Sequence, residues 1–143
     1  MSYSTFSGPI RSGTVREGAV ANVGLCELTQ TILMGQNSTN VVDATFYLPQ
    51  NAQIVNFLVD VLTAFDSATS ATFSAGIASG GTQYASGVNV KAAAGRIAPA
   101  YTGTQLTNMS NVSTNTTLVA SITPVGATTA GSVNVTVQYI QKL

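Results

Sequence analysis

Three stretches of this chain alternate apolar and polar residues with a period of two, and this alternation limits the fold more than any other feature. From Val133 to Tyr139, every second residue is Val or Tyr, and Asn, Thr and Gln stand between them. Ala71–Ile77 and Thr116–Thr123 repeat the pattern. Because successive side chains of a strand point to opposite faces, these stretches predict strands with one buried face.

Further strands are predicted where β-branched and aromatic residues gather between turn residues. Asn22–Met34 predicts a strand with a bulge, because its alternation slips between Leu25 and Leu28. Asp43–Leu48 predicts a short strand that Pro49 closes. The apolar content of Gln53–Leu62 indicates a central strand.

The turn residues between Phe65 and Ser70 predict that Gln53–Leu62 and Thr69–Ala78 form a hairpin. Tyr84–Val90 fits either a weak strand or a single helical turn. Thr104–Met109 predicts a short helical turn capped by Thr104.

Seven or eight strands separated by turns predict an all-β fold, a single-domain antiparallel β-sandwich of jelly-roll type. A length of 143 residues suits one domain. The residues expected to face the core are Phe57, Val59, Phe73, Leu118, Ile122, Val135 and Val137.

The first 18 residues differ from the rest, so we expect an extended N-terminal arm over residues 1–18 and the sandwich over residues 19–143. The arm is too short to fold alone, yet it holds two aromatic residues and two of the five basic residues. Arginine binds carboxylates with two hydrogen bonds, and an extended segment can add a strand to a sheet edge. The alternative is a first strand of the chain's own sheet. The residues predicted to bind a partner are Tyr3, Phe6, Arg11 and Arg16.

The chain has five acidic residues, five basic residues and no histidine, which leaves little for catalysis or metal binding. Nucleophilic triads need an imidazole or an equivalent base. Cys26 is the only cysteine, so neither a zinc framework nor an intrachain disulfide is available. We therefore expect no enzyme, no cofactor, no metal and no small-molecule substrate.

The acidic residues, Glu17, Glu27, Asp43, Asp60 and Asp66, are isolated in the sequence. Asp60 interrupts an apolar strand, so burial would require a partner such as Arg96, Lys91 or backbone amides. A minimal hydrolase or lyase remains the alternative, and it would need two facing carboxylates in a pocket.

Zero net charge also bears on partners. The chain lacks the basic footprint that nucleic-acid binding requires. It also lacks a run of about 18 apolar residues, so no membrane span is expected. The start has no signal-peptide pattern, which predicts a protein made in the cytoplasm. A soluble domain with so few charges is expected to bury much of its surface against other subunits.

Three segments resemble the head-decoration, or capsid cement, proteins of tailed bacteriophages. They are the opening FSGPIRSGTVREG, the middle from FYLPQNAQIVNFLVDVLTAFDSATS to KAAAGRI, and the closing TTLVASITPVGATTAGSVNVTVQYIQ. The resemblance covers most of the chain and rests on packing and turn motifs.

The resemblance implies a structural virion protein on the outer capsid surface. It implies a homotrimer that bridges subunits of the major capsid protein, and no catalytic residues. We expect a subunit interface larger than about 1,000 Å². A tail- or fibre-associated module that binds a receptor or carbohydrate is the alternative, and a groove lined by exposed Tyr or Phe would distinguish it.

Overall fold

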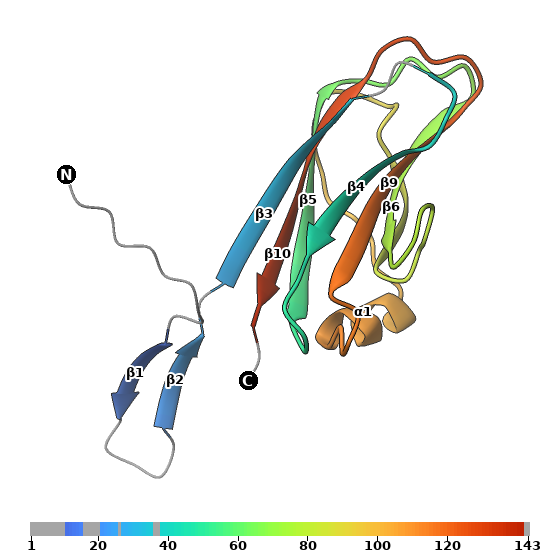
Figure 1. Cartoon of the computed structure of the whole chain (residues 1–143). Helices are drawn as coiled ribbons and strands as arrows, with labels where there is room; N and C mark the ends of the chain where they lie inside the picture. Colours follow the sequence, from blue (N-terminus) through green and yellow to red (C-terminus); the bar gives the residue numbers. More distant parts are fainter. Residues whose placement is uncertain (1–10, 16–20, 26, 36–37, 142–143) are drawn as a thin grey trace, which may run out of the picture.

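The computed structural model describes the backbone of residues 11–15 and 21–25, and all of residues 27–35 and 38–141. These residues form an all-β sandwich of two antiparallel four-stranded sheets, with a separate two-stranded sheet near the N-terminus (Figure 1). The strands are β1 (Arg11–Val15), β2 (Ala21–Leu25), β3 (Glu27–Gly35), β4 (Val42–Tyr47), β5 (Gln53–Thr63), β6 (Ser70–Gly76), β7 (Ala85–Asn89), β8 (Gly95–Ile97), β9 (Thr117–Val125) and β10 (Ser132–Ile140).

One sheet has the strand order β3-β10-β5-β8 and is called the β3 sheet below, and the other has the order β4-β9-β6-β7 and is called the β4 sheet. From β3 to β10, every connection except that between β6 and β7 crosses from one sheet to the other. Strands that are neighbours in a sheet are therefore mostly distant in sequence, as β3 and β10 are.

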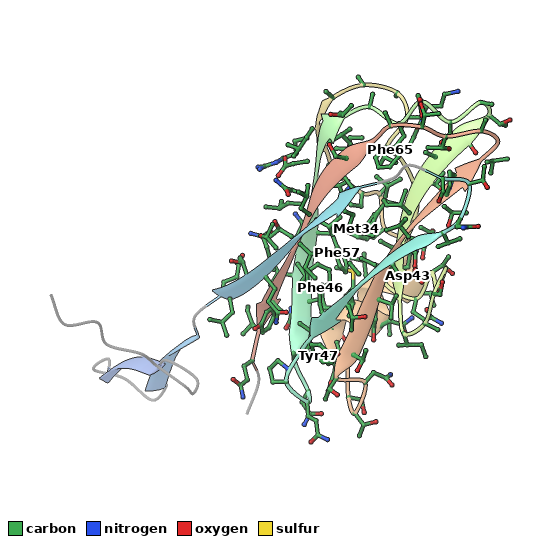
Figure 2. All side chains as sticks on the ribbon, turned by 45° about the horizontal axis from the view of Figure 1, so that its top comes forward. Met34, Asp43, Phe46, Tyr47, Phe57 and Phe65 are labelled. Carbon is green, nitrogen blue, oxygen red and sulfur yellow. The ribbon has the colours of Figure 1, made fainter. Side chains whose placement is uncertain are left out.

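The inner faces of the two sheets enclose a single apolar core, and Met34, Phe46 and Phe57 lie within it (Figure 2). Phe57 of β5 and Phe73 of β6 contact each other across the sandwich, with ring centroids 6.0 Å apart. The seven predicted core residues are confirmed, since each is at most 1% exposed. Alternation thus identified the buried face of both sheets.

The predicted hairpin of Gln53–Leu62 with Thr69–Ala78 is wrong, because β5 and β6 lie in different sheets. The turn residues between them bond to the distant β9–β10 connection instead of closing a tight turn. The hydroxyls of Ser67 and Thr128 are 2.8 Å apart and buried.

The predicted bulged strand Asn22–Met34 is also wrong. Its first part is β2, which pairs with β1, and its second part is β3, which pairs with β10. The predicted arm boundary at residue 18 falls within residues 16–20, outside the described residues. Tyr84–Val90 is resolved in favour of a strand, because it contains β7.

The helical segment is α1 (Gly103–Ser110), which extends the predicted segment Thr104–Met109 by one residue at each end. Its N-cap is Thr102, not Thr104. The Thr102 hydroxyl accepts a hydrogen bond from the Gln105 backbone N–H, and the Gln105 side chain accepts one from the Thr102 N–H. This capping box explains why the N-cap lies two residues earlier than expected.

Candidate functional site: an outer sheet face with few charges

Three of the four residues predicted to bind a partner, Tyr3, Phe6 and Arg16, lie outside the described residues. The backbone of Arg11 begins β1 and lies opposite Leu25 of β2. The structure therefore places one end of the predicted arm in a two-stranded sheet, and the side chain of Arg11 also lies outside the described residues.

Asp60 is paired with Arg96, one of the three kinds of partner that the sequence suggested. Arg96 of β8 donates two hydrogen bonds to its carboxylate, at 2.7 and 3.1 Å, and the two residues are cross-strand neighbours. The bonds from Arg96 hold the pKa of Asp60 below its usual range. The pair is not buried, because the side chain of Arg96 is 63% exposed. Asp60 is thus an ionised carboxylate on the sheet surface, and the charge of Arg96 neutralises it.

Asp66 links two connections at one end of the sandwich. Its carboxylate accepts hydrogen bonds from the Thr129 hydroxyl and from the backbone N–H groups of Thr129 and Ala130. These bonds, the hydroxyl first, lower the pKa of Asp66 to about 2. The arrangement stabilises an ionised carboxylate with a structural role, unlike a general acid.

Asp43 of β4 accepts a hydrogen bond of 2.6 Å from the hydroxyl of Ser121 on β9. The same hydroxyl oxygen accepts a bond of 2.8 Å from the backbone N–H of Gly80, in the β6–β7 connection. Ser121 points away from the core and is nevertheless 0% exposed. The β6–β7 connection, residues 77–84, therefore folds over the outer face of the β4 sheet and is called the cover loop below; it is the light-green segment beside β6 in Figure 1.

The outer face of the β3 sheet has a different surface, which we call the open face. Its rows of cross-strand neighbours run from β3 across β10 to β5. One row contains Thr31, Thr136 and Leu58, and the hydroxyls of Thr31 and Thr136 are 2.7 Å apart. Such a row presents hydroxyls and apolar groups without a charge.

The neighbouring rows continue this chemistry. Thr29, Gln138 and Asn56 form one row, whereas Leu33 and Asn134 lead to the Asp60–Arg96 pair in the other. Leu33 is 62% exposed and Leu62, further along β5, is 53% exposed. The open face therefore combines amides, hydroxyls and exposed leucines. Of its described charged residues, Asp60 pairs with Arg96, and Glu27 lies at the first position of β3.

Tyr101 closes the edge of β5 where β8 no longer pairs with it. Its hydroxyl accepts a hydrogen bond from the Phe57 N–H at 3.0 Å and donates one to Asn56 at 2.7 Å. Burial raises the pKa of Tyr101, so the hydroxyl stays protonated. The side chain thus replaces a missing strand at the border of the open face.

A groove of about 480 Å³ lies at the β7–β8 edge of the sandwich, between β7 and residues 92–100. Its walls are mainly alanine, glycine and proline, and no aromatic residue lines it. Tyr47, at 70% exposed, lies outside this groove, on the outer side of β4. The groove therefore has no aromatic platform on which a sugar ring would stack.

Within the described part of the chain, no three His, Cys, Asp or Glu side chains come together as metal ligands would. No helix there has the length and apolar character needed to cross a bilayer. Comparison with protein-family models, curated proteins and solved structures finds no match to this chain. The surface chemistry of the sandwich is therefore what bears on function.

Sequence analysis predicted partner-binding residues in the N-terminal arm and did not identify the open face. Asn134, Thr136 and Gln138 alternate with buried residues of β10, so their outward direction was readable. Their neighbours on β3 and β5 were not, because strand order is set by contacts distant in sequence. An exposed leucine among outward hydroxyls and amides, as at Leu33, is the feature that would have drawn attention to this face.

Proposed function

We propose that this protein is a structural virion protein that decorates and stabilises the outer surface of a tailed-phage capsid. In this role it is a homotrimer that bridges subunits of the major capsid protein, and it catalyses no reaction. The open face is the observation that carries the proposal. Protein interfaces are depleted of Lys, Glu and Asp at their centres, and two rows of the open face, Thr31–Thr136–Leu58 and Thr29–Gln138–Asn56, contain none of these residues.

The fold is part of the proposal, and we assign the sandwich to the jelly-roll type. Eight strands in two sheets, with all connections but one crossing between the sheets, support that assignment. Jelly rolls occur in viral capsid proteins and in lectins, so the fold alone does not choose between the two roles. The absence of aromatic side chains from the described groove favours the capsid role over carbohydrate binding.

The engaged carboxylates also support a role without catalysis. Asp43, Asp60 and Asp66 each bind a neighbour of the fold, and none of the three faces a second acid in a pocket. A cement protein needs area and shape, and many weak contacts on a lattice add up to durable attachment.

The test compares two matched substitutions on opposite outer faces. Leu62→Glu places a charge on the open face, and Val125→Glu places the same charge on β9, where the valine is 49% exposed. Both variants should fold as the wild type does. Because an unpaired charge in an interface costs several kcal/mol, Leu62→Glu should weaken binding to capsids assembled without this protein by more than about tenfold.

Co-sedimentation of each variant with such capsids measures the effect. Val125→Glu should bind as the wild type does. If the wild type fails to bind capsids, or if Leu62→Glu binds as tightly as Val125→Glu, the proposed function is wrong.

A further inference from the structure

The β1–β2 hairpin is a sheet of only two strands. Five residues of β1 pair with five of β2, and neither strand pairs with the β3 sheet or the β4 sheet. A two-stranded hairpin on its own is marginally stable in water. Each of its strands has one edge whose N–H and C=O groups have no ladder partner among the described strands.

The chain geometry keeps β2 from pairing with β3 of the same chain. β2 ends at Leu25 and β3 begins at Glu27, so a single residue separates the two strands. The shortest common hairpin loop has two residues. β2 therefore cannot fold back on β3, and the hairpin lies beyond the start of β3, away from both four-stranded sheets (Figure 1).

The sandwich has four edge strands, and they differ as acceptors for another strand. β8 has only three residues. β7 has five, but its pairing with β6 is irregular and Gly87 has a φ of +67°. The edge of β4 is occupied at Tyr47, whose carbonyl and N–H bond to the side-chain amide of Gln30. β8 and β7 thus lack a regular run of backbone groups, and β4 has only six residues, the last of which is engaged by Gln30.

β3 is the exception. It has nine residues, and its register with β10 shows no shift along the whole strand. It contains no Pro and no Lys, and Glu27 is its only charged residue. Pro, Lys and bulges are the usual means by which edge strands avoid pairing with another chain. The edge of β3 thus has the length and regularity that a five-residue strand requires.

We propose that the β1–β2 hairpin of one copy adds to the free edge of β3 in a second copy of this chain. The hairpin and the β3 edge lie at different places on the molecule, so the contact runs head to tail. Three copies related by a three-fold axis close such contacts into a ring. The inference specifies the self-association within the proposed function, and it is tested without capsids.

Disulfide trapping between two differently sized copies tests the contact. Both copies carry Cys26→Ala, which removes the only native cysteine. The donor copy carries Thr14→Cys or Asn22→Cys, which are partners in the hairpin. The acceptor copy carries a cysteine on β3 at Thr29, Thr31 or Leu33, three exposed positions that span the strand.

After mixing and mild oxidation, at least one donor–acceptor pair should give a covalent product with the combined mass of both copies. A control acceptor with Thr123→Cys, on the outer face of β9, should give about tenfold less product, because distant cysteines meet only by random collision. Equal yields from β3 and β9, or no product from any donor with any β3 position, would overturn the inference.

A double variant with Asn22→Cys and Thr31→Cys in one chain distinguishes a contact between two copies from a contact within one chain. Excess cysteine-free protein should suppress its cross-link if the link joins two copies. A cross-link that persists within single chains means that the hairpin reaches its own β3, and the inference is then wrong. Melting curves of each variant confirm that the sandwich is intact.

Hydrogen exchange gives a readout that needs no cysteine. Val23→Pro interrupts β2 at the position opposite Gly13 without touching the sandwich strands. Backbone amides of β3 should then exchange about tenfold faster, and those of the central strand β5 should not change. If the backbone amides of β3 exchange at the same rate in Val23→Pro and in the wild type, no hairpin pairs with the edge of β3.

Discussion

The outer faces of the two sheets differ, although both sheets have four antiparallel strands and bury their other face in the same core. On the β4 sheet, Ser74 and Ser121 point outward and are buried, because the cover loop lies on them. On the β3 sheet, the equivalent outward positions hold Thr31, Leu33 and Thr136, and no described segment covers them. The cover loop covers the outer face of the β4 sheet, and no described segment covers the outer face of the β3 sheet.

The sizes of the outward side chains on the two sheets agree with this difference. Outward positions under the cover loop are small, and a Cβ on Gly76 would lie 2.1 Å from the side chain of Gln83 and 2.6 Å from the backbone of Gly81. Side chains of α1 bind the same loop, since Gln105 donates to the carbonyl of Thr82 and Asn108 to that of Gln83. The open face instead has leucines and long amides, which a covering loop would have to displace.

The largest loss of stability is expected from a substitution in the core between the two sheets. Phe57→Ala removes a ring that is 0% exposed and that contacts Phe73, so unfolding free energy should fall by about 3–5 kcal/mol. Leu62→Ala, on the same strand but facing outward, should change it by less than about 0.5 kcal/mol. Thermal and urea unfolding measure both. A Phe57→Ala variant as stable as Leu62→Ala would mean that the strand register is wrong.

The next prediction concerns how tightly the cover loop packs on the β4 sheet. Gly76→Ala forces a methyl group into Gln83 and Gly81, so we expect a loss of about 1–3 kcal/mol and faster hydrogen exchange in residues 77–84. Gly103→Ala is the control, because a Cβ there meets no atom within 4 Å. As the first residue of α1, it should raise stability by at most about 1 kcal/mol. If Gly76→Ala leaves the loop protected, the outer face of the β4 sheet is not tightly covered.

A third test removes one hydroxyl from each outer face. Ser121→Ala breaks the bonds to Gly80 and Asp43, so the loss should be about 1 kcal/mol. Thr136→Val breaks the exposed bond to Thr31 and should cost less than about 0.5 kcal/mol. Equal losses in denaturant unfolding would remove the energetic distinction between the covered and the open face.

These contrasts show which parts of the fold the sequence could predict. Alternation is a local property, so the inward residues of β5, β6, β9 and β10 were predicted correctly. Sheet membership is not local. The turn around Asp66 looked like a hairpin turn, but its polar side chains bond to residues more than 60 positions away.

The elements missed by the sequence depend on distant partners as well. β8 has three residues, and its place in the sheet is secured by pairing with β5 and by the bonds of Arg96 to Asp60. The cover loop left a readable sign, namely small outward residues at Ser74, Gly76 and Ser121. The open face left another in the uncharged outward residues of β10. Neither feature could be recognised as part of a surface from the sequence, because the order of the strands in each sheet depends on contacts between residues distant in sequence.

The last and smallest effect concerns the end of the sandwich where two connections cross between the sheets. Asp66, in the β5–β6 connection, binds Thr129 and Ala130 in the β9–β10 connection. Its folded pKa is about 2, below the value of about 3.9 expected when the chain is unfolded. The unfolded state therefore binds a proton more readily, and the stabilisation is present above about pH 4 and is lost as the pH falls toward 2.

Asp66→Asn keeps a hydrogen-bond acceptor and removes the charge, so its melting temperature should fall less steeply than that of the wild type between pH 4 and pH 2. Asp60→Asn serves as the comparison, because the pKa of Asp60 is also lowered but its partner Arg96 lies within the same sheet. Melting curves recorded at several pH values measure the slopes. If the wild type and Asp66→Asn show the same slope, the ionised carboxylate of Asp66 does not stabilise this end of the sandwich, and the two connections are held together there by the Ser67–Thr128 bond and by backbone hydrogen bonds.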